Sequence, residues 1–251
     1  MDILKDLKLV YSKTVQISKD LIIKNPIVLF LPMIFTLILN YLESSSLSGL
    51  LFYNSLLGSL IYALIYSAIM SIYFSVLSDL VYFGRIKIQN IFNTRNFSNY
   101  LFNIYFVVFV YSWVSLFSSN FYLLGLILYI VFNPIAESIY IKDKQYIESF
   151  TYTLNFMKEN ILHWLILLIV YGILSSLILS PNAIIESISK QDYINISLGF
   201  KTYLPSLNNT DNLIRYIIFY LLTGVYIVFR ASLFNILSKS TLRKRKYMGS
   251  I

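Results

Sequence analysis

Six long apolar stretches restrict the folds that this 251-residue chain can adopt. They cover residues 27–42, 56–77, 100–118, 121–140, 161–180 and 213–237. A helix needs about 20 apolar residues to cross the hydrocarbon core of a bilayer, and the stretches are close to that length. Because a chain in lipid must satisfy its backbone groups internally, we expect each stretch to be a transmembrane helix. The sequence therefore predicts an all-α, polytopic membrane protein with a single membrane domain over residues 1–251.

Composition agrees with this prediction and leaves no length for a soluble catalytic domain. Hydrophobic residues make up 57% of the chain and charged residues only 13%, compared with roughly 25% charged residues in soluble domains. The chain has no cysteine, which excludes disulfides, thiolate metal sites and cysteine nucleophiles. It has no P-loop, dinucleotide or nucleophile-elbow pattern, and its one histidine cannot build an ordinary zinc site. We expect no enzymatic activity, no cofactor and no metal.

The positions of the basic residues predict the orientation of the chain. Sixteen of the 20 fall on segments that a six-span arrangement places in the cytoplasm: Lys5, Lys8, Lys13, Lys19, Lys24, Arg85, Lys87, Arg95, Lys142, Lys144, Lys158, Lys239, Arg243, Lys244, Arg245 and Lys246. Only Lys190 and Lys201 fall on outside segments. Because positive residues accumulate on the cytoplasmic side, both termini are predicted to be cytoplasmic. The net charge of +8 then reflects topology, and nucleic acid is not an expected partner.

Two segments that precede apolar stretches are amphipathic. In residues 1–24 the apolar face consists of Ile3, Leu7, Val10, Thr14, Ile17 and Leu21. Lysines occupy the opposite face, which is typical of a helix that lies in the membrane interface and is attracted to anionic lipid of the inner leaflet. Residues 147–161 repeat this design, and residues 238–251 form a basic cytoplasmic tail.

The two amphipathic segments also share a short pattern. The first reads Ser18-x-x-Leu21-x-x-Lys24-Asn25 and the second reads Thr153-x-x-Phe156-x-Lys158-x-Asn160. Residues 85–99 are a weaker third copy. The pattern predicts three units, each a cytoplasmic amphipathic helix followed by a hairpin of two spans.

A proline and a glutamate near the inner end of the fourth stretch precede the second amphipathic segment. The residues of this motif are Pro134, Glu137, Glu148, Phe150, Thr153, Phe156, Lys158 and Asn160. The motif resembles a loose family of six-span prokaryotic membrane proteins, which includes the membrane domain attached to some glycerophosphoryl diester phosphodiesterases. Phenylalanine replaces the leucine of that family twice, and threonine replaces its serine. The resemblance implies a six-span fold in a prokaryotic plasma membrane, but not the phosphodiesterase activity, which belongs to a soluble barrel domain.

Charged residues within the spans form a candidate site. Arg230 lies about eight residues from the inner end of the last span, roughly 12 Å deep, where a charge needs a partner or water. We expect it to pair with Glu137 first and Asp79 second, because the late residues of the second, fourth and sixth spans share the cytoplasmic half. Asn133 and Tyr220 are the polar residues expected nearby. The cluster is either a polar site open to the cytoplasm or a salt bridge that fixes helix packing, and the second interpretation is favoured.

Hydroxyl groups follow one face of the second span, at Ser59, Tyr62, Tyr66 and Tyr73. They either line a polar pathway or, as is more common, form hydrogen bonds between helices. His163 begins the fifth span beside Trp164, where interfacial aromatic residues usually lie.

Together these features predict a non-enzymatic membrane protein that acts through contacts with lipid or with other membrane proteins, for example in envelope assembly or in a transport complex. The alternative is a transporter, or a subunit of one, with a polar pathway between the second, fourth and sixth spans. A continuous water-accessible cavity would distinguish the two. An intramembrane enzyme would need a converging acid and base, which the sequence does not offer.

Overall fold

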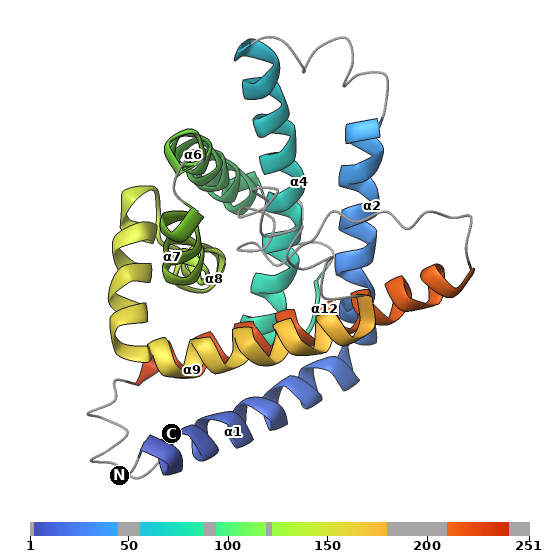
Figure 1. Cartoon of the computed structure of the whole chain (residues 1–251), viewed down its shortest axis with the longest axis vertical. Helices are drawn as coiled ribbons and strands as arrows, with labels where there is room; N and C mark the ends of the chain where they lie inside the picture. The colour runs from blue at the N-terminus through green and yellow to red at the C-terminus, as the bar shows by residue number, and fades with distance from the viewer. Residues whose placement is uncertain (1–2, 45–55, 88–93, 119–121, 180–209, 241–251) are drawn as a thin grey trace.

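The computed structural model describes residues 3–44, 56–87, 94–118, 122–179 and 210–240, and their regular structure is all helical (Figure 1). The elements are α1 Ile3–Lys24, the 3-10 helix η1 Pro26–Phe30, α2 Leu31–Ser44, α4 Leu56–Phe83, α6 Thr94–Ser118, α7 Tyr122–Phe132, α8 Ile135–Lys142, α9 Ile147–Leu179 and α12 Thr210–Lys239. Each of the six apolar stretches lies mainly in one or two of these helices. The all-α prediction is confirmed for this part of the chain.

Three helices are long and apolar enough to cross a membrane: Leu60–Phe83, Ile147–Leu179 and Leu213–Lys239. A fourth candidate is the pair Leu4–Lys24 and Pro26–Leu39, which is bent by 98°. The chain is thus a helical protein with three to four candidate spans among its described residues. The six-span arrangement and the cytoplasmic termini stay predictions.

Two sharp bends occur at asparagines. α1 ends at Lys24 and the chain turns at Asn25 into η1 and α2, and α9 turns at Asn160 (Figure 1). In each bend the side-chain Nδ2 donates to the carbonyl four residues earlier, at 3.1 Å to Leu21 and 3.0 Å to Phe156. The side-chain amide thereby hydrogen-bonds a backbone carbonyl in the last turn before the bend. This carbonyl stays satisfied while the backbone leaves the helical path.

These bends fall at equivalent positions of the pattern that relates the two amphipathic segments. Ser18 and Thr153, seven residues before the two asparagines, are both buried. The two segments therefore share their geometry as well as several residues: an amphipathic helix, an asparagine bend and then an apolar helix. The third segment falls partly on residues 88–93, which lie outside the described residues.

The apolar face of α1 packs against the helices and does not project into water. Val10 and Thr14 are fully buried, and Ile17 and Leu21 pack against the core. The main neighbour of α1 is α12. The expectation that this stripe faces the bundle or lipid is confirmed for these residues.

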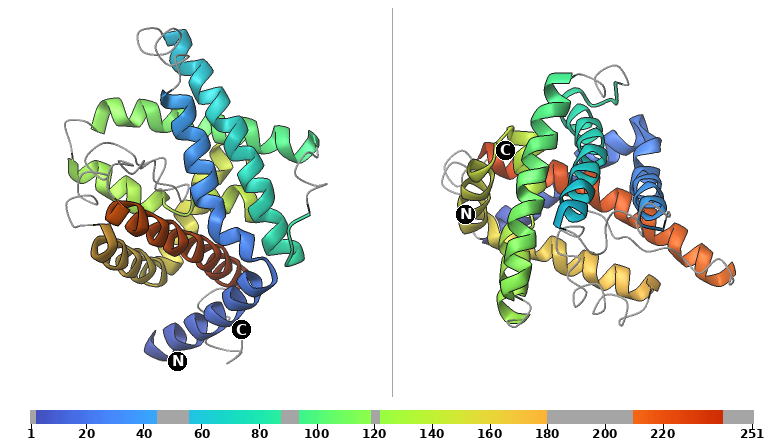
Figure 2. Two further views of the ribbon diagram at one scale, coloured as in Figure 1. Left: turned by 90° about the vertical axis from the view of Figure 1, so that its right-hand side faces the viewer. Right: turned by 90° about the horizontal axis from the view of Figure 1, so that it is seen from above.

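α12 is the central helix. It contacts α1, η1, α2, α4, α8 and α9, and 67% of its most apolar stretch is buried, against 22% for α9. It passes the lower end of α2, while α2 and α4 run side by side (Figures 1 and 2). The close approach of η1 requires a glycine, because a Cβ at Gly224 would lie 2.6 Å from the carbonyl oxygen of Leu29.

Replacing Gly224 by alanine should therefore destabilise the protein by about 1 to 3 kcal/mol, since the backbone of η1 must move. Thermal unfolding of the purified protein in detergent measures this effect. Gly172→Ala is the matched control, because a Cβ there meets nothing within 4 Å and alanine favours a helix. Equal stability of the two variants would contradict the close contact.

Candidate functional site

The fourth apolar stretch is broken in its second half. α7 ends at Phe132, α8 begins at Ile135, and Asn133 and Pro134 form a turn between them. Proline lacks the N–H that would continue the helix, and its ring clashes with the preceding turn. The helix that we expected over residues 121–140 is therefore interrupted at Asn133 and Pro134. The break leaves the Asn133 carbonyl available to another helix.

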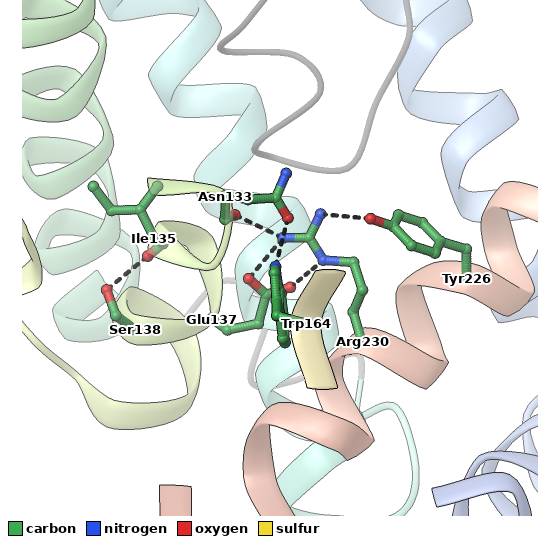
Figure 3. A network of polar contacts seen from close by, with 7 residues as sticks. All are labelled: Asn133, Ile135, Glu137, Ser138, Trp164, Tyr226 and Arg230. Atoms are coloured by element: carbon green, nitrogen blue, oxygen red, sulfur yellow. Dashed lines mark hydrogen bonds and ion pairs between the residues drawn. The ribbon is translucent and has the colours of Figure 1, made fainter. Parts of the chain in front are cut away.

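Arg230 of α12 meets this break and pairs with Glu137 on the first turn of α8 (Figure 3). Its Nε lies 2.6 Å from Oε1 of Glu137 and its Nη2 lies 2.8 Å from Oε2. The side chains are 1% and 3% exposed, so the pair is buried. Two parallel charge-assisted hydrogen bonds are the strongest arrangement that these groups can form. The predicted pairing of Arg230 with Glu137 is confirmed.

Groups from three helices enclose the guanidinium. Its Nη2 donates to the Asn133 carbonyl at 2.9 Å, and its Nη1 is 3.5 Å from the Tyr226 hydroxyl. The Trp164 indole N–H donates to the Asn133 side-chain oxygen at 2.9 Å. The rings of Trp164 and Tyr226 each lie 5.4 Å from the guanidinium carbon, within the range of cation–π attraction. Figure 3 shows these groups converging on Arg230 from α7–α8, α9 and α12.

Trp164 and Tyr226 were not among the predicted site residues. Tyr226 lies four residues before Arg230, so the helical period places both on one face and was a usable signal. Trp164 was expected at the membrane interface, yet it is fully buried. No pattern in the sequence pointed to its contact with Asn133, because that contact depends on how α9 packs.

The remaining cluster residues lie elsewhere. Asp79 is buried near the end of α4, where its Oδ2 accepts a hydrogen bond from the Lys87 backbone at 3.2 Å. It thus supports the turn that follows α4. Tyr220 is buried ten residues before Arg230, about 15 Å away along α12, and its ring packs against Phe219.

The predicted hydroxyl face of the second span packs into the core where the structure describes it. Tyr66 and Tyr73 are buried, Tyr62 is half-buried, and the Ser59 side chain lies outside the described residues. The Tyr73 ring contacts Phe35 with a centroid distance of 4.9 Å. This placement agrees with the packing interpretation of the face.

Three further serines, at positions 67, 71 and 75, lie buried one turn apart on α4. Each Oγ donates to the carbonyl four residues earlier in its own helix, at 2.6, 2.6 and 2.9 Å. Their hydroxyl groups are therefore satisfied within α4, and small side chains of this kind allow neighbouring helices to approach closely.

A second buried polar contact ties α1 to α9. His163 Nε2 lies 3.3 Å from Asp6 Oδ2, with the side chains 4% and 5% exposed. The Tyr11 hydroxyl donates to the His163 carbonyl at 2.6 Å. Asp6 was not among the predicted site residues, although it falls in phase with the buried Val10 and Thr14 on the inner face of α1.

The described residues bring no three His, Cys, Asp or Glu side chains together as a metal site. Comparisons of the chain with protein-family models, curated proteins and solved structures give no match. The resemblance carried by residues 134–160 stays a prediction.

Loss of either partner of the central pair should strongly destabilise the protein. Arg230→Ala and Glu137→Ala should each cost about 3 to 5 kcal/mol, because each leaves an unpaired buried charge. The double variant should recover part of this loss. Thermal unfolding in detergent and protein abundance in the membrane measure the effect. Arg215→Ala, at an exposed position of the same helix, is the control and should change stability by less than about 0.5 kcal/mol. Strictly additive losses would contradict the pairing.

Removal of the Asp6 carboxylate should loosen α1 from the bundle. Because the chain has no cysteine, a single cysteine at the fully buried Val10 reports this release through maleimide labelling in detergent. We expect slow labelling of Val10→Cys alone and labelling at least tenfold faster when Asp6→Ala is added. A cysteine at the exposed Gln16 should label quickly in both backgrounds. Equal protection of position 10 with and without Asp6 would show that the contact does not hold α1.

Proposed function

We propose that this chain is a non-enzymatic, six-span protein of a prokaryotic plasma membrane that acts through contacts with lipid and with other membrane proteins. The observation that carries this proposal is the Arg230–Glu137 pair. Its charges neutralise each other, its donors point to Glu137, Asn133 and Tyr226, and both side chains are buried. A buried charge whose donors are used in this way supports helix packing, whereas a charge that faces a water-filled cavity would indicate a substrate or ion path.

Helix lengths support six spans with both termini in the cytoplasm. At about 1.5 Å per residue, the 25 residues of α6 extend roughly 37 Å, enough to cross the hydrocarbon core. α7 and α8 together cover residues 122–142, so this broken pair is also long enough for one crossing. The even number of spans agrees with the basic residues at both ends of the chain.

The outer surface of α9 supports contact with acyl chains or with another membrane protein. After its bend, α9 exposes large apolar side chains on successive turns: Leu162 at 52%, Ile169 at 57%, Ile173 at 55% and Leu177 at 77%. Water would disfavour such a row, whereas lipid or an apolar partner accommodates it. On α1, the exposed Lys5, Lys8 and Lys19 are suited to anionic lipid at the inner leaflet.

A transporter is the second candidate, and the break at Pro134 favours it. Non-helical backbone at membrane depth is tolerated where it is buried in protein or lines a water-filled cavity, and transporters use such breaks to bind substrates. In this chain the break lies against a buried cation and between α4, α9 and α12. The two candidates therefore differ in whether water reaches the break.

Two conservative cysteine variants distinguish these candidates. Ala136→Cys and Ala231→Cys place a thiol beside Glu137 and beside Arg230, at positions that are 2% and 0% exposed. In native membranes we expect neither to react with a small charged methanethiosulfonate reagent from either side. Lys144→Cys on the cytoplasmic loop is the reactive control. Rapid reaction at either alanine position would reveal an aqueous path and would replace the proposal with the transporter.

Labelling of single introduced cysteines tests the predicted topology, because the chain has no cysteine of its own. Cysteines that replace Lys24, Lys87, Lys144 and Lys246 should react with an impermeant maleimide only after the inner face is opened. A cysteine that replaces Lys201 should react in intact cells. Labelling of position 144 from outside would overturn the six-span arrangement.

A further inference from the structure

A polar pocket of about 390 Å³ lies between the bend of α9 and the C-terminal end of α12. Asn155, Glu159 and Asn160 line it from α9, and Lys239 and Ser240 line it from the end of α12. Its volume falls within the roughly 300 to 1,000 Å³ of sites for small molecules. The Arg230 pair does not contribute to its lining, so this is a separate site.

The pocket lies at the boundary between two kinds of surface. Before the bend, α9 is amphipathic and carries the exposed Lys158 and Glu159. Directly after Asn160 it exposes the apolar Ile161 and Leu162, at 41% and 52%. A change from charged to apolar surface at one bend marks the level at which lipid headgroups lie.

Opposite charges line the pocket without neutralising each other. Within the described part of the chain, Glu159 and Lys239 form no ion pair with one another, although both line the same pocket. Two exposed side chains of opposite charge that remain apart can hold a ligand with both an anionic and a cationic group between them.

Lys239 is the lysine that lines the pocket, and its charge also acts on Lys142, which lies outside the lining. The pKa of Lys142, at the end of α8, is lowered by burial and then by the positive charges of Lys239 and Lys144. Like charges that depress a lysine pKa repel one another. An anion bound at Lys239 would relieve this repulsion, so this side favours a phosphate.

We propose that this pocket binds a zwitterionic phosphoethanolamine headgroup, with its phosphodiester at Lys239 and its primary ammonium at Glu159. The exposed Asn155 adds an amide to the lining, whereas the Asn160 amide and the Ser240 hydroxyl already donate to the carbonyls of Phe156 and Ile236. The headgroup belongs either to a phospholipid, whose acyl chains then follow the exposed surface beyond Asn160, or to free glycerophosphoethanolamine. The lipid source rests on the proposed position of this end of the bundle at the cytoplasmic interface.

Lipid retention by the full-length protein tests this site. The protein is purified from vesicles that contain phosphatidylethanolamine, phosphatidylcholine and phosphatidylglycerol in equal amounts, and the retained lipid is counted by native mass spectrometry. We expect phosphatidylethanolamine to be retained about tenfold over phosphatidylcholine, because three N-methyl groups prevent its nitrogen from donating to Glu159.

Two variants separate the roles of the charges. Lys239→Gln should lower retention of phosphatidylethanolamine about tenfold and should also lower retention of phosphatidylglycerol, because both carry the phosphate. Glu159→Gln should lower only phosphatidylethanolamine, so that the preference over phosphatidylglycerol disappears. Lys158→Gln and Glu148→Gln are matched controls on the same stretch of α9 outside the pocket lining, and they should stay within about twofold of the unchanged protein. All four positions are exposed, so folding should be preserved, which thermal unfolding checks.

Addition of glycerophosphoethanolamine alone distinguishes the two sources. If millimolar amounts of this compound stabilise the protein thermally, and Glu159→Gln abolishes the effect, the ligand is the free compound. If the compound does not stabilise the protein but phosphatidylethanolamine is selectively retained, the ligand is the phospholipid. Equal retention of the three lipids, with no effect of Glu159→Gln and no stabilisation by the free compound, would overturn the site. If Lys158→Cys is labelled from the cytoplasm in that case, the proposed function stands without the pocket; labelling from outside would instead refute the proposed orientation.

Discussion

The two-pronged contact between Arg230 and Glu137 joins α12 to the first turn of α8, and much of the core is arranged around it. A guanidinium this deeply buried must find a carboxylate and further acceptors, since an unpaired charge would cost several kcal/mol. The break at Pro134 supplies one of those acceptors by turning the Asn133 carbonyl toward α12. Trp164 fixes the other end of Asn133, so the same contact also positions α9. The ion pair, the helix break and the packing of Trp164 therefore depend on one another.

α12, which carries Arg230, also contacts most of the other helices of the fold. One of its faces holds Arg230, while Gly224 lets η1 approach so closely that no side chain fits between them. α1 packs along the same helix and is held to α9 by Asp6 and His163. The two asparagine bends let amphipathic helices and apolar helices meet at steep angles. These bends set the level at which polar surface gives way to apolar surface.

In this arrangement the buried charges are different residues from the exposed charges on which the proposed lipid contacts depend. The buried charges of Arg230 and Glu137 are used to hold helices together, whereas the exposed charges on α1 and around the pocket beside Asn160 are the ones that the proposals assign to lipid. A protein built in this way is suited to recognising the polar heads and apolar tails of lipids at its surface. Among the described residues, the break at Pro134 also suits transport, because it places a non-helical backbone carbonyl, that of Asn133, against a cation.

The sequence by itself determined the helical class, the apolar stretches on which the long helices form, and the pairing of Arg230 with Glu137. These follow from local rules: apolar length, helical period, and the cost of a charge in the span combined with the rise per residue. Tertiary structure decided the break at Pro134, the burial of Trp164, the Asp6–His163 contact and the hydrogen bond of Asp79 to the Lys87 backbone. These depend on which helix faces cross and at what angle, and the lipid-like side chains of the spans are too similar to specify this by pattern alone. Gly224 is an example. The sequence does not show why glycine is needed at this position of an apolar helix, because the need arises from the backbone of η1, which lies against it.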